Sequence, residues 1–233
     1  MQAGTRLCYN GEAEEAKRVE VWLLSVPETI GTQEEGLLLA GMLPERRKAI
    51  PLVRLPDKRR ERLAAYALEG LVLSRAAGQP ADRLRLERGP YGKPRLAGES
   101  AVQYSLSHTA GWVLLGVDKR AIGVDIERVR PVSSGLMKRY FSPEEQAVVC
   151  APEKDWESRA IEIWTCKEAF GKWTGEGLRR VRGDDWRRDP AVQVYAFGAE
   201  GYAAAVCGTA PCVRPDIQKW SLERLCGELA CNA

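Results

Sequence analysis

The sequence has no long apolar run, and this absence excludes the simplest kind of membrane protein. No stretch approaches the roughly 20 apolar residues that a helix needs to cross a bilayer. A secretory signal peptide has an apolar segment between a basic start and a cleavage site, and residues 1–17 contain no such segment. We therefore expect a soluble, cytoplasmic protein with no membrane partner.

The chain also has little excess charge and almost no histidine. Its 35 Lys and Arg residues and 32 Asp and Glu residues leave a formal net charge of +3, and His108 is the single histidine. Proteins that coat nucleic acid carry a larger positive excess, so we expect no nucleic-acid partner. Any site for an anion must then be a local cluster of basic side chains.

The number of cysteines is odd. Seven cysteines cannot all pair as disulfides, and we expect mostly reduced thiols, as in a cytosolic protein. The pairs Cys207/Cys212 and Cys226/Cys231 could together be drawn as four zinc ligands. Their spacing is wider than the usual C-x-x-C and no histidine supports them, so we expect no zinc site.

What is present is an ordinary globular composition. The chain has 233 residues, of which 45% are hydrophobic and 29% charged, which suits one large domain or two small lobes that share a core. From Leu43 to Arg62 the sequence is basic and interrupted by proline, and we expect a loop that leads into a helix. That helix should begin near Asp57 and end at Gly78.

The remaining segments predict short strands mixed with helices, and hence an α+β protein of two similar-sized halves. The Ser142-Pro-Glu-Glu145 segment has a hydroxyl cap, an early proline and a capping-box glutamate, so it should start a helix. The other expected elements are a loop tip at Arg88–Pro94, strands at Val102–Ser107, Trp112–Val117 and Ala121–Ile126 joined by two hairpin turns, a helix at Glu153–Trp173, and a hairpin of Val192–Phe197 with Tyr202–Val206.

Two carboxylates share one face of an expected strand. The period of two in a strand places Asp125 and Glu127 on one side and the apolar Ile122, Val124 and Ile126 on the other. Oxygen ligands at this spacing suit a hard cation such as Mg²⁺, which would also offset their repulsion. The alternative is a pair of solvated charges on an edge strand.

The expected helix at Trp156–Trp173 carries charges beside an apolar stripe. Lys167 lies inside the stripe, Glu168 lies at its border, and Lys172 follows Glu168 by about one turn. Burying such charges is costly unless partners or a metal ion offset them. The alternative is an ordinary Glu168–Lys172 ion pair beside a Lys167 that extends to solvent.

Two further features could bind phosphate. His108 lies between the hydroxyls of Ser107 and Thr109 at a strand end, an arrangement that suits either a phosphate or a hydrogen-bonded turn. The basic Arg46–Arg62 stretch lies at a helix entrance, where an anion is favoured, although a solvated basic surface is equally consistent with the pattern.

Taken in order, these motifs resemble the signature of the Sfp-type 4′-phosphopantetheinyl transferases over about residues 43–208. The matching segments are Gly92-Lys-Pro94, Ser105-Leu-Ser-His-Thr109, Ile122-Gly-Val-Asp-Ile-Glu127, Trp164-Thr-Cys-Lys-Glu-Ala-Phe-Gly-Lys172 and Gly175-Glu-Gly-Leu178. The resemblance implies a monomer of two similar-sized α+β lobes, residues 1–119 and 120–233, related by a pseudo-twofold axis. Coenzyme A and Mg²⁺ would bind in the cleft between the lobes.

The resemblance also implies an activity and a set of site residues. Such enzymes move the phosphopantetheine arm of coenzyme A to a serine of an apo acyl or peptidyl carrier protein and release adenosine 3′,5′-bisphosphate. In this sequence Asp125, Glu127 and Glu168 would hold Mg²⁺, Glu168 would also be the base, and Lys172 would stabilise the leaving group. The implied coenzyme A contacts are Lys167, Ser107 and His108 with the phosphates, and Lys93 and Pro94 near the nucleotide. The basic stretch matches the family only loosely, and for the 3′-phosphate we expect Arg46 and Arg62, because both lie at the helix entrance.

Two other functions are compatible with single motifs. An Mg²⁺-dependent nucleotide or pyrophosphate hydrolase would share the acidic cluster, and a non-catalytic binding module would use the Arg46–Arg62 stretch. Hydrolase activity would not explain why the Gly-Lys-Pro and Ser-His segments are present. The near-neutral net charge of the chain argues against the binding module.

Overall fold

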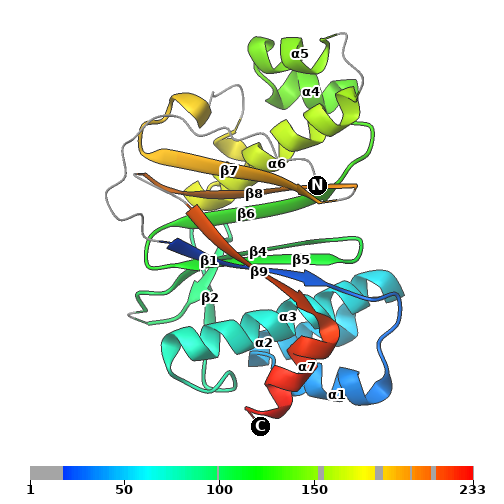
Figure 1. Cartoon of the computed structure of the whole chain (residues 1–233). Coiled ribbons are helices and arrows are strands. Elements are labelled where there is room, and N and C mark those ends of the chain that lie inside the picture. Colours follow the sequence, from blue (N-terminus) through cyan, green and yellow to red (C-terminus); the bar gives the residue numbers. More distant parts are fainter. Residues whose placement is uncertain are drawn as a thin grey trace.

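The computed structural model describes residues 18–98, 100–151, 155–181, 186–199, 201–210 and 214–232. It has four layers, in which helices, one sheet, a second sheet and further helices lie one on another (Figure 1). Among the described residues, no helix combines the length and the apolar character needed to cross a membrane. The α+β class expected from the sequence is confirmed.

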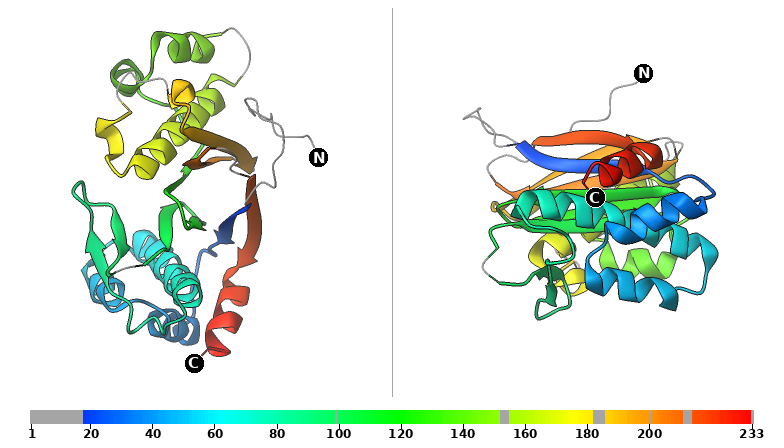
Figure 2. Two further views of the ribbon diagram at one scale, coloured as in Figure 1. Left: turned by 90° about the vertical axis from the view of Figure 1, so that its left-hand side faces the viewer. Right: turned by 90° about the horizontal axis from the view of Figure 1, so that it is seen from below.

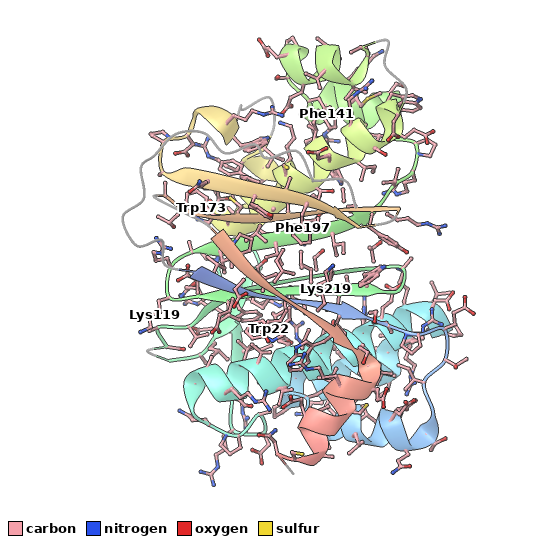
Figure 3. All side chains as sticks on the ribbon, in the orientation of Figure 1. Trp22, Lys119, Phe141, Trp173, Phe197 and Lys219 are labelled. Atoms are coloured by element: carbon pink, nitrogen blue, oxygen red, sulfur yellow. The ribbon has the colours of Figure 1, made fainter. Side chains whose placement is uncertain are left out.

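The first sheet has the strand order β4-β5-β1-β9. Strand β1 (Arg18–Ser25) pairs antiparallel with β5 (Trp112–Asp118) and parallel with β9 (Arg214–Ser221), and β4 (Gln103–Thr109) forms the other edge beside β5. Helices α1 (Thr32–Ala40), α3 (Pro56–Ala77) and α7 (Leu222–Ala230) lie on its outer face (Figures 1 and 2). Trp22 of β1, labelled in Figure 3, packs in the core on this helical side.

The second sheet has the order β6-β8-β7 and is antiparallel throughout. Its strands are β6 (Ile122–Arg128), β7 (Val192–Ala199) and β8 (Tyr202–Thr209), and the last two form the hairpin that the sequence predicts. Helix α6 (Trp156–Thr174) packs on its outer face, and α5 (Pro143–Val149) packs in turn on α6. The remaining elements of this half are α4 (Ser134–Tyr140), η2 (Gly177–Arg179) and η3 (Trp186–Arg188).

The two sheets meet face to face over an apolar layer. Alternate residues of β1 and β6, such as Val21 and Val124, pack there with Leu114 of β5 and Val206 of β8. This burial uses the Ile122, Val124 and Ile126 face of β6, so Asp125 and Glu127 lie on the opposite face, toward α6. The expected separation of the two faces of β6 is therefore confirmed.

One of the two expected hairpins in the middle of the chain is wrong. Strands β4 and β5 do form a hairpin, with Gly111 at φ 84° in the turn, but β5 and β6 belong to different sheets. Strand β6 instead packs against the face of β5, and Gly116 of β5 allows the close approach. A Cβ there would lie 2.7 Å from side-chain atoms of Ile122 and Val124, which is too close for any residue larger than glycine.

The basic segment before α3 is also more ordered than the expected loop. Helix α2 (Pro44–Ala49) and the 3₁₀ turn η1 (Ile50–Leu52) occupy most of it, and α3 then ends at Gly78 as expected. Proline at the first helical position, Glu45 in the first turn and basic residues in the last turn are favourable in a short helix. The loop tip at Arg88–Pro94 connects two short strands, β2 (Leu86–Arg88) and β3 (Pro94–Leu96), which pair as a hairpin.

The helix signals around Ser142 and Gly175 are confirmed. Ser142 and Glu145 form a reciprocal capping box at the start of α5, with N–O distances of 3.2 and 2.9 Å. Helix α6 ends at Gly175, whose φ of 78° suits glycine. The expected start of α6 at Glu153 lies outside the described residues, and the described helix begins at Trp156.

The end of the chain returns to the first half of the molecule. Trp220, Leu225 and Leu229 are buried in the same core as Leu68 of α3. Packing therefore groups β9 and α7 with the first sheet, whereas a division at residues 119 and 120 groups them with the second. The pseudo-twofold relation of two lobes stays a prediction.

Candidate active site

A pocket of about 350 Å³ opens where the two halves of the molecule meet. Its walls come from α2, α3, the β2–β3 hairpin and β4 on one side, and from the end of α6 and the start of η2 on the other. Figure 2 shows the hairpin extending toward the second half. Of the expected catalytic, metal and coenzyme A residues, those that line it are Arg46, Lys93, Pro94, His108 and Lys172.

Asp125 lies at the junction of the two halves and is almost fully buried. Its Oδ1 accepts hydrogen bonds from Ser107 Oγ and from Lys172 Nζ, both at 2.8 Å. Its Oδ2 is also buried but finds no hydrogen-bond partner among the described residues. An unpaired carboxylate oxygen is costly inside a protein, so this atom is available to a ligand.

Two further carboxyl groups are close enough to Asp125 to be affected by its charge. Burial and repulsion by Asp125 raise the pKa of Glu168 to about 7, while the cation of Lys172 acts in the opposite sense. Burial, followed by repulsion from Asp125, also raises the pKa of Glu127. A cation placed among these carboxylates would relieve the repulsion.

The structure supplies carboxylate oxygens for a divalent cation but does not gather them into a complete coordination site. Among the described residues, no three His, Cys, Asp or Glu side chains converge closely enough to form a metal cluster by themselves. However, the atoms that could ligate a metal ion here are carboxylate oxygens, which Mg²⁺ prefers, and Oδ2 of Asp125 is unpaired. Because Mg²⁺ usually keeps several waters and binds one or two carboxylates with substrate phosphates, the residues present fit such a site.

Two lysines contribute positive charge near the pocket. Lys172 Nζ is held by Asp125, and Lys93 Nζ donates to the carbonyl oxygen of Ile122 at 2.8 Å. This second bond ties the β2–β3 hairpin to the first residue of β6. Burial, with a smaller contribution from the charge of Lys172, lowers the pKa of Lys93 to about 8.

His108 is held in place by a buried glutamate. Its Nδ1 lies 3.2 Å from Oε2 of Glu61, which also accepts from Lys58 at 2.9 Å. Burial lowers the pKa of His108, although Glu61 opposes this effect. Arg62 does not line the pocket, but its charge is near enough to act on His108, and its Nε is buried without a partner in the described chain.

The other end of the pocket wall contains a second buried ion pair. Arg46 donates two hydrogen bonds, of 2.6 and 2.7 Å, to the carboxylate of Glu69, and its guanidinium lies 4.4 Å from the ring centroid of Tyr66. Tyr104 lines the pocket with them, and its buried hydroxyl lies beside the Arg46–Glu69 pair. The sequence therefore placed Arg46 at the pocket but did not reveal that a carboxylate already holds it.

Two residues proposed from the sequence as coenzyme A ligands are not brought to the pocket. Lys167 is fully buried, with Nζ 2.9 Å from Oε2 of Glu145. This pair links α6 to the capped start of α5, and the physical reason is that a buried ammonium needs a carboxylate partner. Ser107 is also buried, and its hydroxyl is used by Asp125.

Sequence reasoning missed the carboxylates that hold the basic side chains. Glu61 and Glu69 are fully buried on α3, eight residues apart, among residues such as Leu68. Their position on the apolar side of an otherwise regular helix is the signal that could have revealed them, because buried carboxylates need cationic partners. Lys58, one partner of Glu61, is a neighbour on α3 itself, whereas Arg46 and His108 come from α2 and β4, which the sequence does not place beside α3.

The chain is similar in sequence to several known proteins. A family model described as the 4′-phosphopantetheinyl transferase superfamily matches residues 121–230. The 4′-phosphopantetheinyl transferase Sfp of Bacillus subtilis is 25% identical over 224 residues, which cover 89% of this chain and 100% of that protein. The 4′-phosphopantetheinyl transferase ffp of Bacillus subtilis is 30% identical over 159 residues, or 61% of this chain and 70% of that protein. The 4′-phosphopantetheinyl transferase HetI of a Nostoc species is 32% identical over 133 residues, covering 54% and 56% of the two chains.

Proposed function

This chain belongs to the 4′-phosphopantetheinyl transferase family, in its Sfp type, and we propose that the pocket between its two halves is where coenzyme A gives up its phosphopantetheine arm. The acceptor is a serine of an apo carrier protein, acyl or peptidyl. The single observation that supports this site best is Asp125, a buried carboxylate with one unpaired oxygen beside a pocket lysine.

In the proposed reaction the carrier serine oxygen attacks the β-phosphorus of coenzyme A. The new bond joins the serine oxygen to this phosphorus, and the bond between the β-phosphorus and the bridging oxygen breaks. Adenosine 3′,5′-bisphosphate leaves with that electron pair. The serine proton must go to a base, and we assign this role to Glu168, a carboxyl group close to both Asp125 and Lys172, whose pKa in the metal-free protein is raised to about 7 by burial and by the charge of Asp125.

Lys172 is suited to the charge that develops on the leaving group. Its ammonium lines the pocket and is held by Asp125, so it needs little reorganisation during the reaction. Asp125, Glu127 and Glu168 would hold Mg²⁺. When bound, this ion would neutralise charge on the pyrophosphate and help to orient it.

The nucleotide part of coenzyme A would lie along the wall formed by the first half. His108, Lys93 and Pro94 line that wall, and Arg46 lies at its end. Both Arg46 and His108 already contact buried carboxylates, so the pocket presents oriented hydrogen-bond donors with little net charge there. Arg62 adds a cation near His108.

We also propose that the protein acts as a monomer in the cytoplasm. The described cysteines Cys150, Cys166, Cys207, Cys226 and Cys231 are all free thiols, as in a reducing compartment, whereas Cys212 of the dismissed zinc pattern lies outside the described residues. Sedimentation of the purified protein would test the monomer.

The experiment that tests the function is incubation of the protein with coenzyme A, Mg²⁺ and an apo carrier protein, followed by the intact mass of the carrier. We expect one phosphopantetheine arm per carrier, and expect Asp125→Ala to reduce transfer by at least about 100-fold. A hydrolase would consume coenzyme A without changing the carrier, and a binding module would change neither. Either result would refute the proposal.

A further inference from the structure

Ser107 contacts Asp125 from the opposite half of the molecule. It lies on β4 of the first sheet, and its Oγ donates a 2.8 Å hydrogen bond to Oδ1 of Asp125 on β6 of the second sheet. Ser107 is 8% exposed and Asp125 is 3% exposed, so water competes little for this bond. A buried hydroxyl with a carboxylate partner makes a strong, charge-assisted hydrogen bond.

The hydrogen bonds on Asp125 are unevenly divided between its two oxygens. Oδ1 accepts from both Ser107 and Lys172, and Oδ2 is the oxygen left without a partner. The terminal torsion of an aspartate is broad, so one donor alone does not fix the orientation of the carboxylate plane. Two donors from different elements hold Oδ1 and keep Oδ2 available.

A second serine on β4 helps to fix the position of Ser107 relative to β6. Ser105 lies two residues earlier, on the same face of the strand, and its Oγ accepts from the backbone N–H of Val124 at 3.0 Å. The two serines thus attach neighbouring residues of β6 to β4 through side chains, at a place where the strands belong to different sheets.

We propose that Ser107 is a positioning residue for Asp125 and does not contact the substrate. Its hydroxyl orients the carboxylate from the opposite half, so the junction of the halves sets the direction in which the unpaired oxygen faces a cation. This inference rests on the proposed metal-dependent transfer. It replaces the expectation from the sequence that Ser107 contacts a coenzyme A phosphate.

The test compares Ser107→Ala with Ser105→Ala, which also removes a buried hydroxyl from β4. Mn²⁺ alone is used as the probe, and its binding is followed by electron paramagnetic resonance of the free ion. Loss of a group that orients a ligand typically weakens metal binding 10- to 100-fold, and we expect a change of this size for Ser107→Ala. Ser105→Ala should lower the melting temperature without a comparable change in Mn²⁺ affinity.

Steady-state kinetics provide the second readout. Ser107→Ala should raise the Mg²⁺ concentration for half-maximal transfer and leave the KM for coenzyme A within twofold of wild type. Ser107→Thr retains a hydroxyl and should recover most of the Mn²⁺ affinity. This variant replaces Ser107→Ala in the test if the alanine variant does not fold. Unchanged Mn²⁺ affinity with a raised KM for coenzyme A would overturn the proposal and restore the phosphate contact.

This test separates the inference from the proposed function. If the wild-type protein transfers no arm to any apo carrier, the proposed function fails, whereas the Mn²⁺ titrations still decide whether Ser107 acts through Asp125. If transfer occurs but Ser107→Ala and Ser105→Ala have equal Mn²⁺ affinities, only the role of Ser107 is refuted.

Discussion

At the scale of single residues, the site consists of ionisable side chains that the fold partly buries. Glu168 faces the charges of Asp125 and Glu127 in a buried setting, and only Lys172 acts in the opposite sense. Such an arrangement costs stability whenever Glu168 is ionised. The same feature that suits it to accept a proton therefore makes the free protein less stable.

The stability cost of Glu168 predicts a pH-dependent gain for Glu168→Gln. The folded-state pKa of about 7 lies above the ordinary glutamate pKa of 4.5, so the stability associated with protonated Glu168 is present below pH 4.5 and is lost as the pH rises through 7. Glutamine is always neutral. At pH 8, in a chelator, we expect Glu168→Gln to unfold with a free energy about 1–3 kcal/mol higher than wild type.

Urea unfolding at two pH values measures this difference. The gain should shrink severalfold at pH 5, where folded wild type is already protonated at Glu168, and transfer activity should be strongly reduced at both pH values. An equal gain at pH 5 and pH 8 would show that the effect does not come from ionisation of Glu168.

A second residue-scale prediction concerns His108. It lines the pocket and is oriented by Glu61, so it is suited to bind substrate and does not contact Asp125 or Lys172 in the structure. We expect His108→Ala to raise the KM for coenzyme A by about tenfold, which corresponds to one hydrogen bond to a charged group, with a much smaller effect on kcat. Calorimetric titration with coenzyme A checks this, and a loss confined to kcat would instead make His108 a proton-transfer residue.

At the scale of elements, the site depends on how closely β6 approaches α6. Gly123 lies on the same face of β6 as Asp125, directly against the helix backbone. A Cβ at this position would be 2.0 Å from the carbonyl oxygen of Ala169 and 2.4 Å from the amide nitrogen of Trp173. Glycine is therefore what allows the carboxylates of the strand to lie beside Glu168 and Lys172.

We predict that Gly123→Ala destabilises the protein and disrupts the site. Backbone atoms on both sides cannot move away cheaply, so we expect a loss of about 3 kcal/mol or more, at the upper end of overpacking effects. Gly198→Ala is the matched control, because a Cβ there would meet only Tyr202 O at an ordinary 3.8 Å. The comparison uses thermal unfolding of the two variants and the transfer rate of each folded protein. Equal melting temperatures would contradict the close packing of Gly123 on α6.

At the scale of the whole molecule, the pocket requires both halves, and the first half requires the end of the chain. Strand β9 adds to β1 in parallel, and α7 buries Leu225 and Leu229 in the core beneath α3. The wall that carries Arg46 and His108 is therefore completed by residues more than a hundred positions later. The C-terminal segment supports the pocket without lining it.

This arrangement predicts that a change in α7 weakens the entire first half. Leu225 is fully buried, so Leu225→Ala should lower the free energy of unfolding by about 2–5 kcal/mol, whereas Glu223→Gln on the exposed face of the helix should change it by less than about 0.5 kcal/mol. Denaturant unfolding followed by tryptophan fluorescence measures both. A Leu225→Ala protein as stable as wild type would mean that α7 is not part of this core.

The sequence by itself determined the local features of this protein. Strand alternation separated Asp125 and Glu127 from the apolar face of β6, the cap signals located the starts or ends of α5 and α6, and the ordered motifs indicated the family. These features depend on neighbours in the chain, so period and turn chemistry suffice to predict them.

Only the tertiary structure decided which distant groups meet. It joined β9 to β1, sent β5 and β6 to different sheets, and gave Lys167 to Glu145 instead of the pocket. It also assigned the hydroxyl of Ser107 to Asp125. The physical reason is that a buried charge or hydroxyl takes whichever partner the packing of remote elements brings within hydrogen-bond distance, and no local pattern specifies that partner.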